Sequence, residues 1–173
     1  MHRPSPGLPD LPGSPAPAPT LAERAGGRLL GAIAPTAVLI AAMWVAQFVL
    51  IFLGRVIIPG VGLIPRRLDG LDGVLFSPVL HAGWAHLIGN TTALLVLGPL
   101  AALVSRRPVA LLVCAWLGSG LLTWVIGTPG VHIGASGIVY VLIAFLIVYG
   151  IAVRRFGAVS SPCSSRSRTW ARA

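Results

Sequence analysis

The longest charge-free run of the chain is PVALLVCAWLGSGLLTWVIGTPGVHIGASGIVYVLIAFLIVYGIAV, residues 108–153, which spans 46 residues. A helix that crosses a bilayer needs about 20 predominantly apolar residues. The sequence Gly127-Thr128-Pro129-Gly130 interrupts the run with residues typical of a turn. The run therefore predicts two membrane-spanning helices, over about 109–126 and 135–153.

Two further charge-free runs, 29–54 and 73–105, precede it and predict spans over about 32–53 and 84–104. Pro35 then falls in the first turns of the first span, where proline is tolerated. The whole chain is 55% hydrophobic and 10% charged, against about 45–50% and about 25% in soluble domains. We therefore predict an all-α membrane protein whose transmembrane domain covers residues 29–155.

The segments around the spans differ from them in composition. Residues 1–28 are rich in proline, and we expect a disordered cytoplasmic N-terminus that is no signal peptide. The connector over 55–80 is broken by Pro and Gly and carries charges of both signs, which suits the membrane interface. Residues 156–173 turn abruptly to Ser and Arg, which fits either a native basic tail or a lost reading frame.

The thirteen basic residues are all arginines, and the formal net charge is +9. They gather at the ends of the apolar runs, as in Arg106-Arg107 and Arg154-Arg155, rather than on one folded face. This pattern indicates membrane topology and no nucleic-acid partner. The positive-inside rule places the N-terminus, the 105–108 loop and the tail in the cytoplasm. We expect a multi-pass protein of a bacterial plasma membrane, with the connector and the 127–134 turn outside.

Few polar side chains enter the spans, where they are costly. His86 and Asn90 are four residues apart and share one face of the second span, and Ser136 begins the fourth. The topology places all three within about 10 Å of one depth. Gly134 and Gly137 flank the serine at a helix start, where free N–H groups favour a nucleophile and an oxyanion. Taken alone, a Gly-x-Ser-Gly sequence in a membrane helix usually reflects close packing, and a His/Asn pair as often forms interhelical hydrogen bonds.

Two motifs resemble those of the rhomboid family of intramembrane serine proteases. The first, His81-Ala-Gly-Trp-Ala-His86-Leu-Ile-Gly-Asn90, has the family's His-x4-His-x3-Asn spacing, and Gly134-Ala-Ser136-Gly137 matches its Gly-x-Ser-Gly. The resemblance covers about residues 30–155. It implies a nucleophile at Ser136, an oxyanion hole with His86 and Asn90, and a supporting role for His81, Gly134 and Gly137. It also implies transmembrane protein substrates cut near the outer leaflet, without cofactor or metal.

The chain departs from the family pattern in two respects. The first-loop Trp-Arg pair of many members has only Arg66 and Arg67 as candidates here. The family core has six helices and a general-base histidine in the sixth, whereas we predict four helices, a rhomboid-like bundle with four of the six present. No histidine of the chain (His2, His81, His86 or His132) matches that base. We therefore expect a chain that is truncated or frameshifted at its C-terminus and inactive.

Three other interpretations remain open at this stage. A rhomboid-like chain without a base could bind transmembrane segments without cutting them. His86 could itself serve as the base, which would remove it from the oxyanion hole. A small transporter is a weaker idea, because the spans carry no Asp, Glu, Lys or Arg. The two cysteines, Cys114 in mid-span and Cys163 in the tail, predict neither a disulfide nor a metal site.

Overall fold

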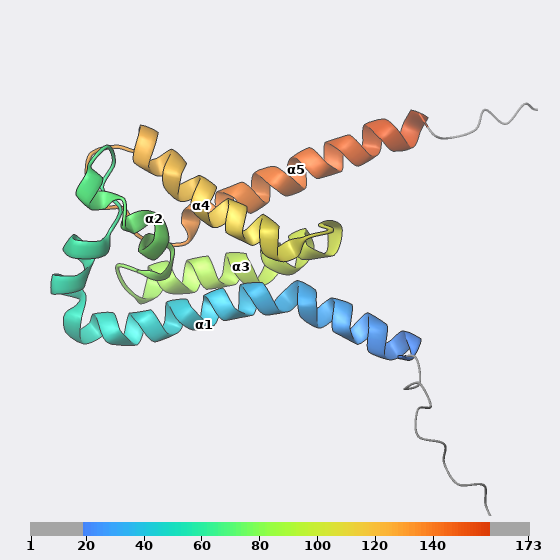
Figure 1. Ribbon diagram of the computed structural model, residues 1–173, viewed down its shortest axis with the longest axis horizontal. Coiled ribbons are helices and arrows are strands. Elements are labelled where there is room, and N and C mark those ends of the chain that lie inside the picture. Colours follow the sequence, from blue (N-terminus) through green and yellow to red (C-terminus); the bar gives the residue numbers. More distant parts are fainter. Residues whose placement is uncertain (1–18, 160–173) are drawn as a thin grey trace, which may run out of the picture.

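A computed structural model describes residues 19–159, and every regular element in this range is helical (Figure 1). The long helices are α1 (Leu21–Val61), α3 (Trp84–Val104), α4 (Pro108–Ile126) and α5 (Ser136–Val159); the short ones are η1 (Leu68–Gly70), α2 (Gly73–Phe76) and η2 (Ser77–Val79). Four segments are long and apolar enough to cross a membrane, namely Leu30–Gly54, Trp84–Val104, Pro108–Ile126 and Ser136–Arg154. The predicted all-helical fold with four spans is confirmed.

The first helix begins earlier than the sequence predicts. The composition predicts disorder throughout residues 1–28, but residues 21–28 form the first turns of α1. Thr20 caps the helix by accepting from the Glu23 N–H, and the Glu23 carboxylate accepts from the Thr20 N–H. This capping box satisfies backbone donors that otherwise lack partners. The predicted disorder of residues 1–18 and the tail over 160–173 lie outside the described residues.

The early start of α1 also corrects the position of Pro35. This proline lies inside α1 rather than in its first turns, and Pro59 lies inside it as well. A proline inside a helix removes one backbone hydrogen bond and bends the helix. Figure 1 shows α1 bending along its length. The helix continues past Gly54 to Val61, so it includes the beginning of the predicted connector.

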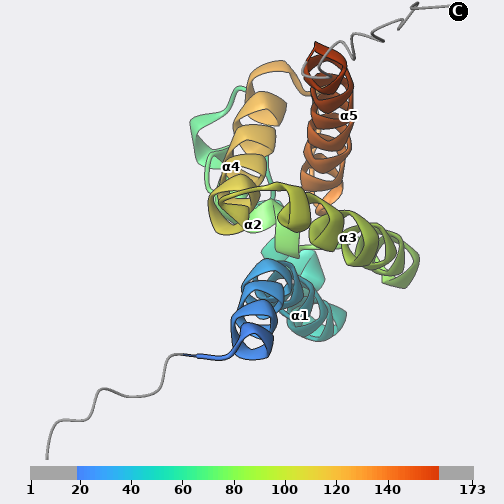
Figure 2. The same ribbon diagram turned by 90° about the vertical axis from the view of Figure 1, so that its right-hand side faces the viewer.

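The helix α3 lies between α1 and α5, and α4 packs against α5 and against α2 of the connector (Figures 1 and 2). Met43, Leu87 and Leu94 are fully buried where α1 meets α3, and Ile138 and Leu142 join them from α5. A Cβ on Gly98 of α3 would overlap Thr36 of α1, so α1 and α3 approach closely at that glycine. This packing brings the start of α5 to the start of α3.

The connector folds over the end of α4 and the turn that follows it. Arg66 donates from its backbone N–H to the Trp124 carbonyl at 2.9 Å and from Nη1 to the Gly127 carbonyl at 2.8 Å. The Trp124 indole N–H donates to the Arg67 carbonyl at 2.8 Å. Carbonyls at a helix C-terminus lack intrahelical partners and carry partial negative charge, which the guanidinium complements. The connector is therefore fastened to α4.

Arg66 has a φ of 60°, a left-handed conformation that is costly for residues other than glycine. We expect Arg66→Ala to lower the free energy of unfolding by about 1 kcal/mol, because the exposed hydrogen bonds are lost and the strain stays. Arg66→Gly loses the same bonds but relieves about 1 kcal/mol of strain, so its stability should stay near that of the wild type. Thermal unfolding in detergent measures both. Equal losses in the two variants would contradict this account.

Candidate functional site

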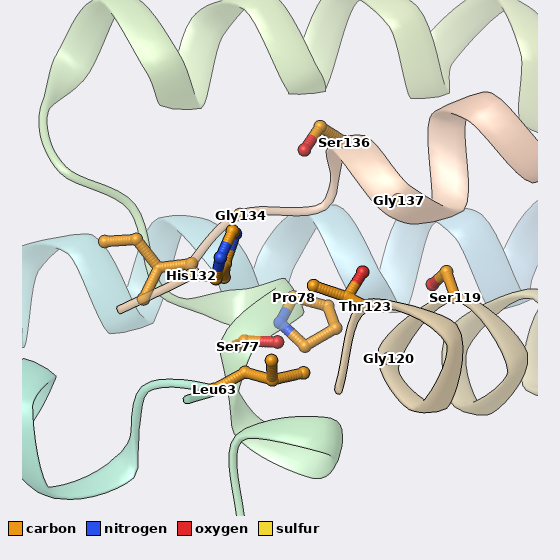
Figure 3. Close-up of a pocket in the computed structure, with 11 residues that line it drawn as sticks. Leu63, Ser77, Pro78, Ser119, Gly120, Thr123, His132, Gly134, Ser136 and Gly137 are labelled. Carbon is orange, nitrogen blue, oxygen red and sulfur yellow. The ribbon is translucent and has the colours of Figure 1, made fainter. Parts of the chain in front are cut away.

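Ser136 is the first residue of α5 and lines a pocket of about 80 Å³ between α4, α5 and the connector (Figure 3). Its neighbour Ala135 is fully buried, whereas Ser136 is half-buried. The side chain therefore faces the pocket from the N-terminal end of a long helix. The positive end of the helix and its unpaired N–H groups favour negative charge at this point.

The backbone before Ser136 is held by the connector. Leu63 and His132 exchange two hydrogen bonds, at 3.0 and 2.8 Å, in an isolated antiparallel bridge. The Gly134 N–H donates to the Ser77 carbonyl at 2.7 Å. These three bonds join the segment that enters α5 to two separate points of the connector. The position of Ser136 thus depends on connector residues that are distant in the sequence.

The side chains of His86 and Asn90 meet the chain at Gly134. A Cβ built on Gly134 would lie 2.5 and 2.6 Å from ring atoms of His86 and 3.5 Å from Asn90 Nδ2. Gly134 also has a φ of 110°, a backbone conformation that residues other than glycine rarely adopt. The glycine therefore allows the two side chains to approach the backbone two residues before Ser136. The structure thus brings His86 and Asn90 to the segment that leads into Ser136.

Asn90 has an unused hydrogen-bond donor. The side chain is 6% exposed, and Nδ2 is buried with no hydrogen-bond partner among the described residues. A buried amide N–H without a partner costs free energy. A negatively charged oxygen placed beside Gly134 would satisfy it, and this is the chemistry of an oxyanion hole.

His81 lies in the loop before α3 and packs edge-on against His86, with ring centroids 5.0 Å apart. It is 1% exposed, and its Nδ1 lies 3.3 Å from the Val79 carbonyl, so this nitrogen carries the proton. Burial lowers the pKa of His81 to about 4, because desolvation disfavours the charged ring. A neutral His81 supports the ring of His86 without adding a charge to the site.

The lowered pKa of His81 predicts acid sensitivity. Between about pH 6.5 and about pH 4 the unfolded chain binds a proton at His81 that the folded chain does not. The free energy of unfolding should therefore fall with decreasing pH across this window, by up to about 1.4 kcal/mol per pH unit. Chemical unfolding of the wild type and His81→Gln at several pH values measures the difference. An identical pH dependence in both proteins would contradict this assignment.

The sequence analysis missed several small polar side chains of the site. Ser119 and Thr123 on α4 and Ser77 of the connector line the same pocket as Ser136 (Figure 3). A Cβ on Gly137 would lie 2.9 Å from that of Ser119, so α4 and α5 approach closely there. The four-residue spacing of Ser119 and Thr123 places both on one helix face and was the available signal. The pocket is polar and large enough to hold water.

Three histidines lie at or near the site, and one of them, His132, lines the pocket together with Ser136 (Figure 3). His81 and His86 pack against each other, as described above. The Nε2 of His132 lies 2.8 Å from the Thr128 carbonyl, which makes this nitrogen a donor. His2 lies outside the described residues. Among the described residues no group of three or more His, Cys, Asp or Glu side chains could hold a metal ion.

Comparison with known proteins places these features in a family context. A family model described as Rhomboid domain matches residues 70–162, more than half of the chain. Uncharacterized proteins of Mycobacterium bovis and Mycobacterium tuberculosis are 46% identical over 101 residues, which is 54% of this chain and 42% of each relative. One of Mycobacterium leprae is 45% identical over 96 residues, 51% of this chain and 38% of the relative. The match thus spans less than half the length of these relatives. No solved structure matches the chain.

Proposed function

The chain belongs to the rhomboid family, and on that premise we propose that it carries the site of an intramembrane serine endopeptidase. Its substrates are transmembrane segments of other proteins, cut near the outer leaflet of a bacterial membrane. Ser136 is the nucleophile, and His86 and Asn90 donate to the oxyanion. His81, Gly134 and Gly137 support the site.

The proposed reaction proceeds through an acyl-enzyme. Ser136 Oγ attacks the scissile carbonyl carbon and passes its proton to a general base, and the carbonyl oxygen becomes an oxyanion. The base returns the proton to the leaving amine as the C–N bond breaks. Water then attacks the ester, and its proton follows the same path back to Ser136. The polar pocket beside Ser136 offers space for that water.

One observation carries the proposal, namely the unsatisfied Asn90 Nδ2 beside Gly134. Packing alone explains a glycine at position 134, but it leaves a buried donor without an acceptor. The developing oxyanion of an ester or amide would supply the acceptor in the transition state. The helix start at Ser136 adds N–H groups with no intrahelical partner.

We further propose that these 173 residues do not include the general base. The family resemblance implies a general-base histidine in a sixth helix, whereas the described residues contain four candidate spans, and His86 is assigned to the oxyanion hole. The chain alone should therefore not hydrolyse a transmembrane substrate in liposomes. Cleavage that disappears in Ser136→Ala would contradict this part of the proposal.

A fluorophosphonate probe tests the nucleophile separately from the base. We expect weak labelling of the purified chain in detergent, increased by millimolar imidazole acting as an external base, and abolished in Ser136→Ala. Strong labelling of the wild type without imidazole that is lost in His86→Ala and restored in that variant by imidazole would instead make His86 the base. The absence of imidazole-dependent labelling in a folded chain would overturn the role of Ser136.

The second candidate function is binding of transmembrane segments without cleavage, and the proposed absence of a general base favours it. If the chain binds without cutting, a transmembrane substrate should co-purify equally with the wild type and Ser136→Ala. Failure to capture any such segment would count against this function.

A further inference from the structure

An apolar groove of about 410 Å³ lies between α1 and α4, away from Ser136. Its walls include Val38, Leu39 and Ala42 from α1, and Val109, Val113 and Trp116 from α4. Val38, Val109 and Val113 are exposed, with exposed fractions of 68%, 58% and 48%, so the protein's own side chains do not fill the groove. Figure 2 shows the two helices one above the other at the end where α4 begins.

The chemistry of the groove selects a hydrocarbon occupant. Its lining residues are apolar, and the one side chain with a polar hydrogen is Trp116. The Trp116 indole N–H donates to the Val74 and Leu75 carbonyls at 3.2 and 3.1 Å, so it is already engaged. A polar ligand inside the groove would therefore lose its hydrogen bonds to water without replacement.

The length of the groove indicates a lipid tail rather than another helix. On α4 the lining runs from Val109 to Leu117, a rise of about 12 Å at about 1.5 Å per residue. This is less than half of the hydrocarbon core, which is about 30 Å thick. Leu75 of the connector lines the far end. A transmembrane helix would need a path through both leaflets, whereas an acyl chain occupies only one.

Two arginines stand at the other end of the groove. Arg106 and Arg107 immediately precede α4 and are exposed. The one ion pair among the described side chains joins Arg67 to Asp69 in the connector, at the opposite end of α4, so it does not engage either arginine. An exposed pair of arginines at the end of a span attracts anionic lipid head groups.

We propose that the groove and the arginine pair together bind an anionic phospholipid. One acyl chain lies along α4 between Val38 and Val113, and the phosphate pairs with Arg106 and Arg107. The site is distinct from the pocket of Ser136, so it stands or falls independently of protease activity. A bound lipid would join α1 to α4 along the groove.

Native mass spectrometry of the full chain in detergent tests this proposal. The probes are phosphatidylglycerol and phosphatidylcholine with identical acyl chains. We expect one phosphatidylglycerol bound about 25-fold more tightly than phosphatidylcholine, or about fivefold per arginine. The Arg106→Gln/Arg107→Gln variant should lose this preference. Arg154→Gln, which removes an exposed arginine at the end of α5, should retain it.

Variants that fill the groove test the contact with the acyl chain separately from the contact with the head group. Ala42→Phe should abolish tight binding of phosphatidylglycerol, whereas Ala41→Phe, which adds the same ring outside the lining, should not. Val113→Phe is the second filling variant if Ala42→Phe does not fold, as judged by circular dichroism. Equal binding of both lipids by the wild type, or equal effects in the paired variants, would overturn the proposal. Displacement by millimolar inorganic phosphate would do the same, by assigning the arginines to a free anion.

Discussion

Replacing Asn90 by alanine is expected to slow the imidazole-dependent labelling of Ser136 by a fluorophosphonate at least 100-fold. Attack of Ser136 on the phosphorus places negative charge on an oxygen that needs preorganised donors. Removing one such donor costs about 100-fold to 1,000-fold in rate in other serine enzymes. Asn90 Nδ2 is buried beside Gly134 without another partner, so its donor capacity is available for this charge.

Thr92→Ala provides the matched control on the same helix. Thr92 is exposed, and its hydroxyl donates to the Ile88 carbonyl within α3. Its loss should leave the labelling rate within twofold of the wild type. A rate for Asn90→Ala equal to that of Thr92→Ala would remove Asn90 from the oxyanion hole. Circular dichroism of both variants shows whether the fold is intact.

Gly73→Ala is expected to produce the largest loss of stability among single methyl additions. A Cβ at Gly73 would overlap the backbone N and Cα of Leu63, which cannot move aside as a flexible side chain can. Leu63 in turn forms the bridge to His132 that positions the entry to α5. We expect the free energy of unfolding to fall by about 3 kcal/mol, the upper range for overpacking of a well-packed core.

The control for this substitution is Gly89→Ala, in the second turn of α3. Gly89 is exposed, and a Cβ there would meet no atom within 4 Å. Alanine is favoured over glycine inside a helix by up to about 1 kcal/mol, so this variant should be as stable as the wild type or slightly more stable. Unfolding in detergent with increasing denaturant measures both. A similar decrease in the free energy of unfolding of both variants would show that the close contact between residue 73 and Leu63 does not cause the destabilisation.

The four spans could be predicted because each depends on local composition. A run of about 20 apolar residues is long enough to cross the bilayer wherever the rest of the chain lies. The predicted ends of α3 and α4 agree with the structure within one residue for the same reason. The start of α1 could not be placed in this way, because Thr20 and Glu23 extend the helix through polar residues beyond the apolar run.

For the candidate site as well, some features depend on local sequence and others on contacts between distant residues. From the sequence alone, helix rise and topology predict that His86, Asn90 and Ser136 lie at similar depth. Only the tertiary structure decided that His86 and Asn90 meet the backbone at Gly134, that Leu63 and Ser77 hold the segment before Ser136, and that α1 and α4 leave a groove. Rotation of each helix about its axis decides these contacts. That rotation follows from many weak packing contacts between distant residues, which no local pattern encodes.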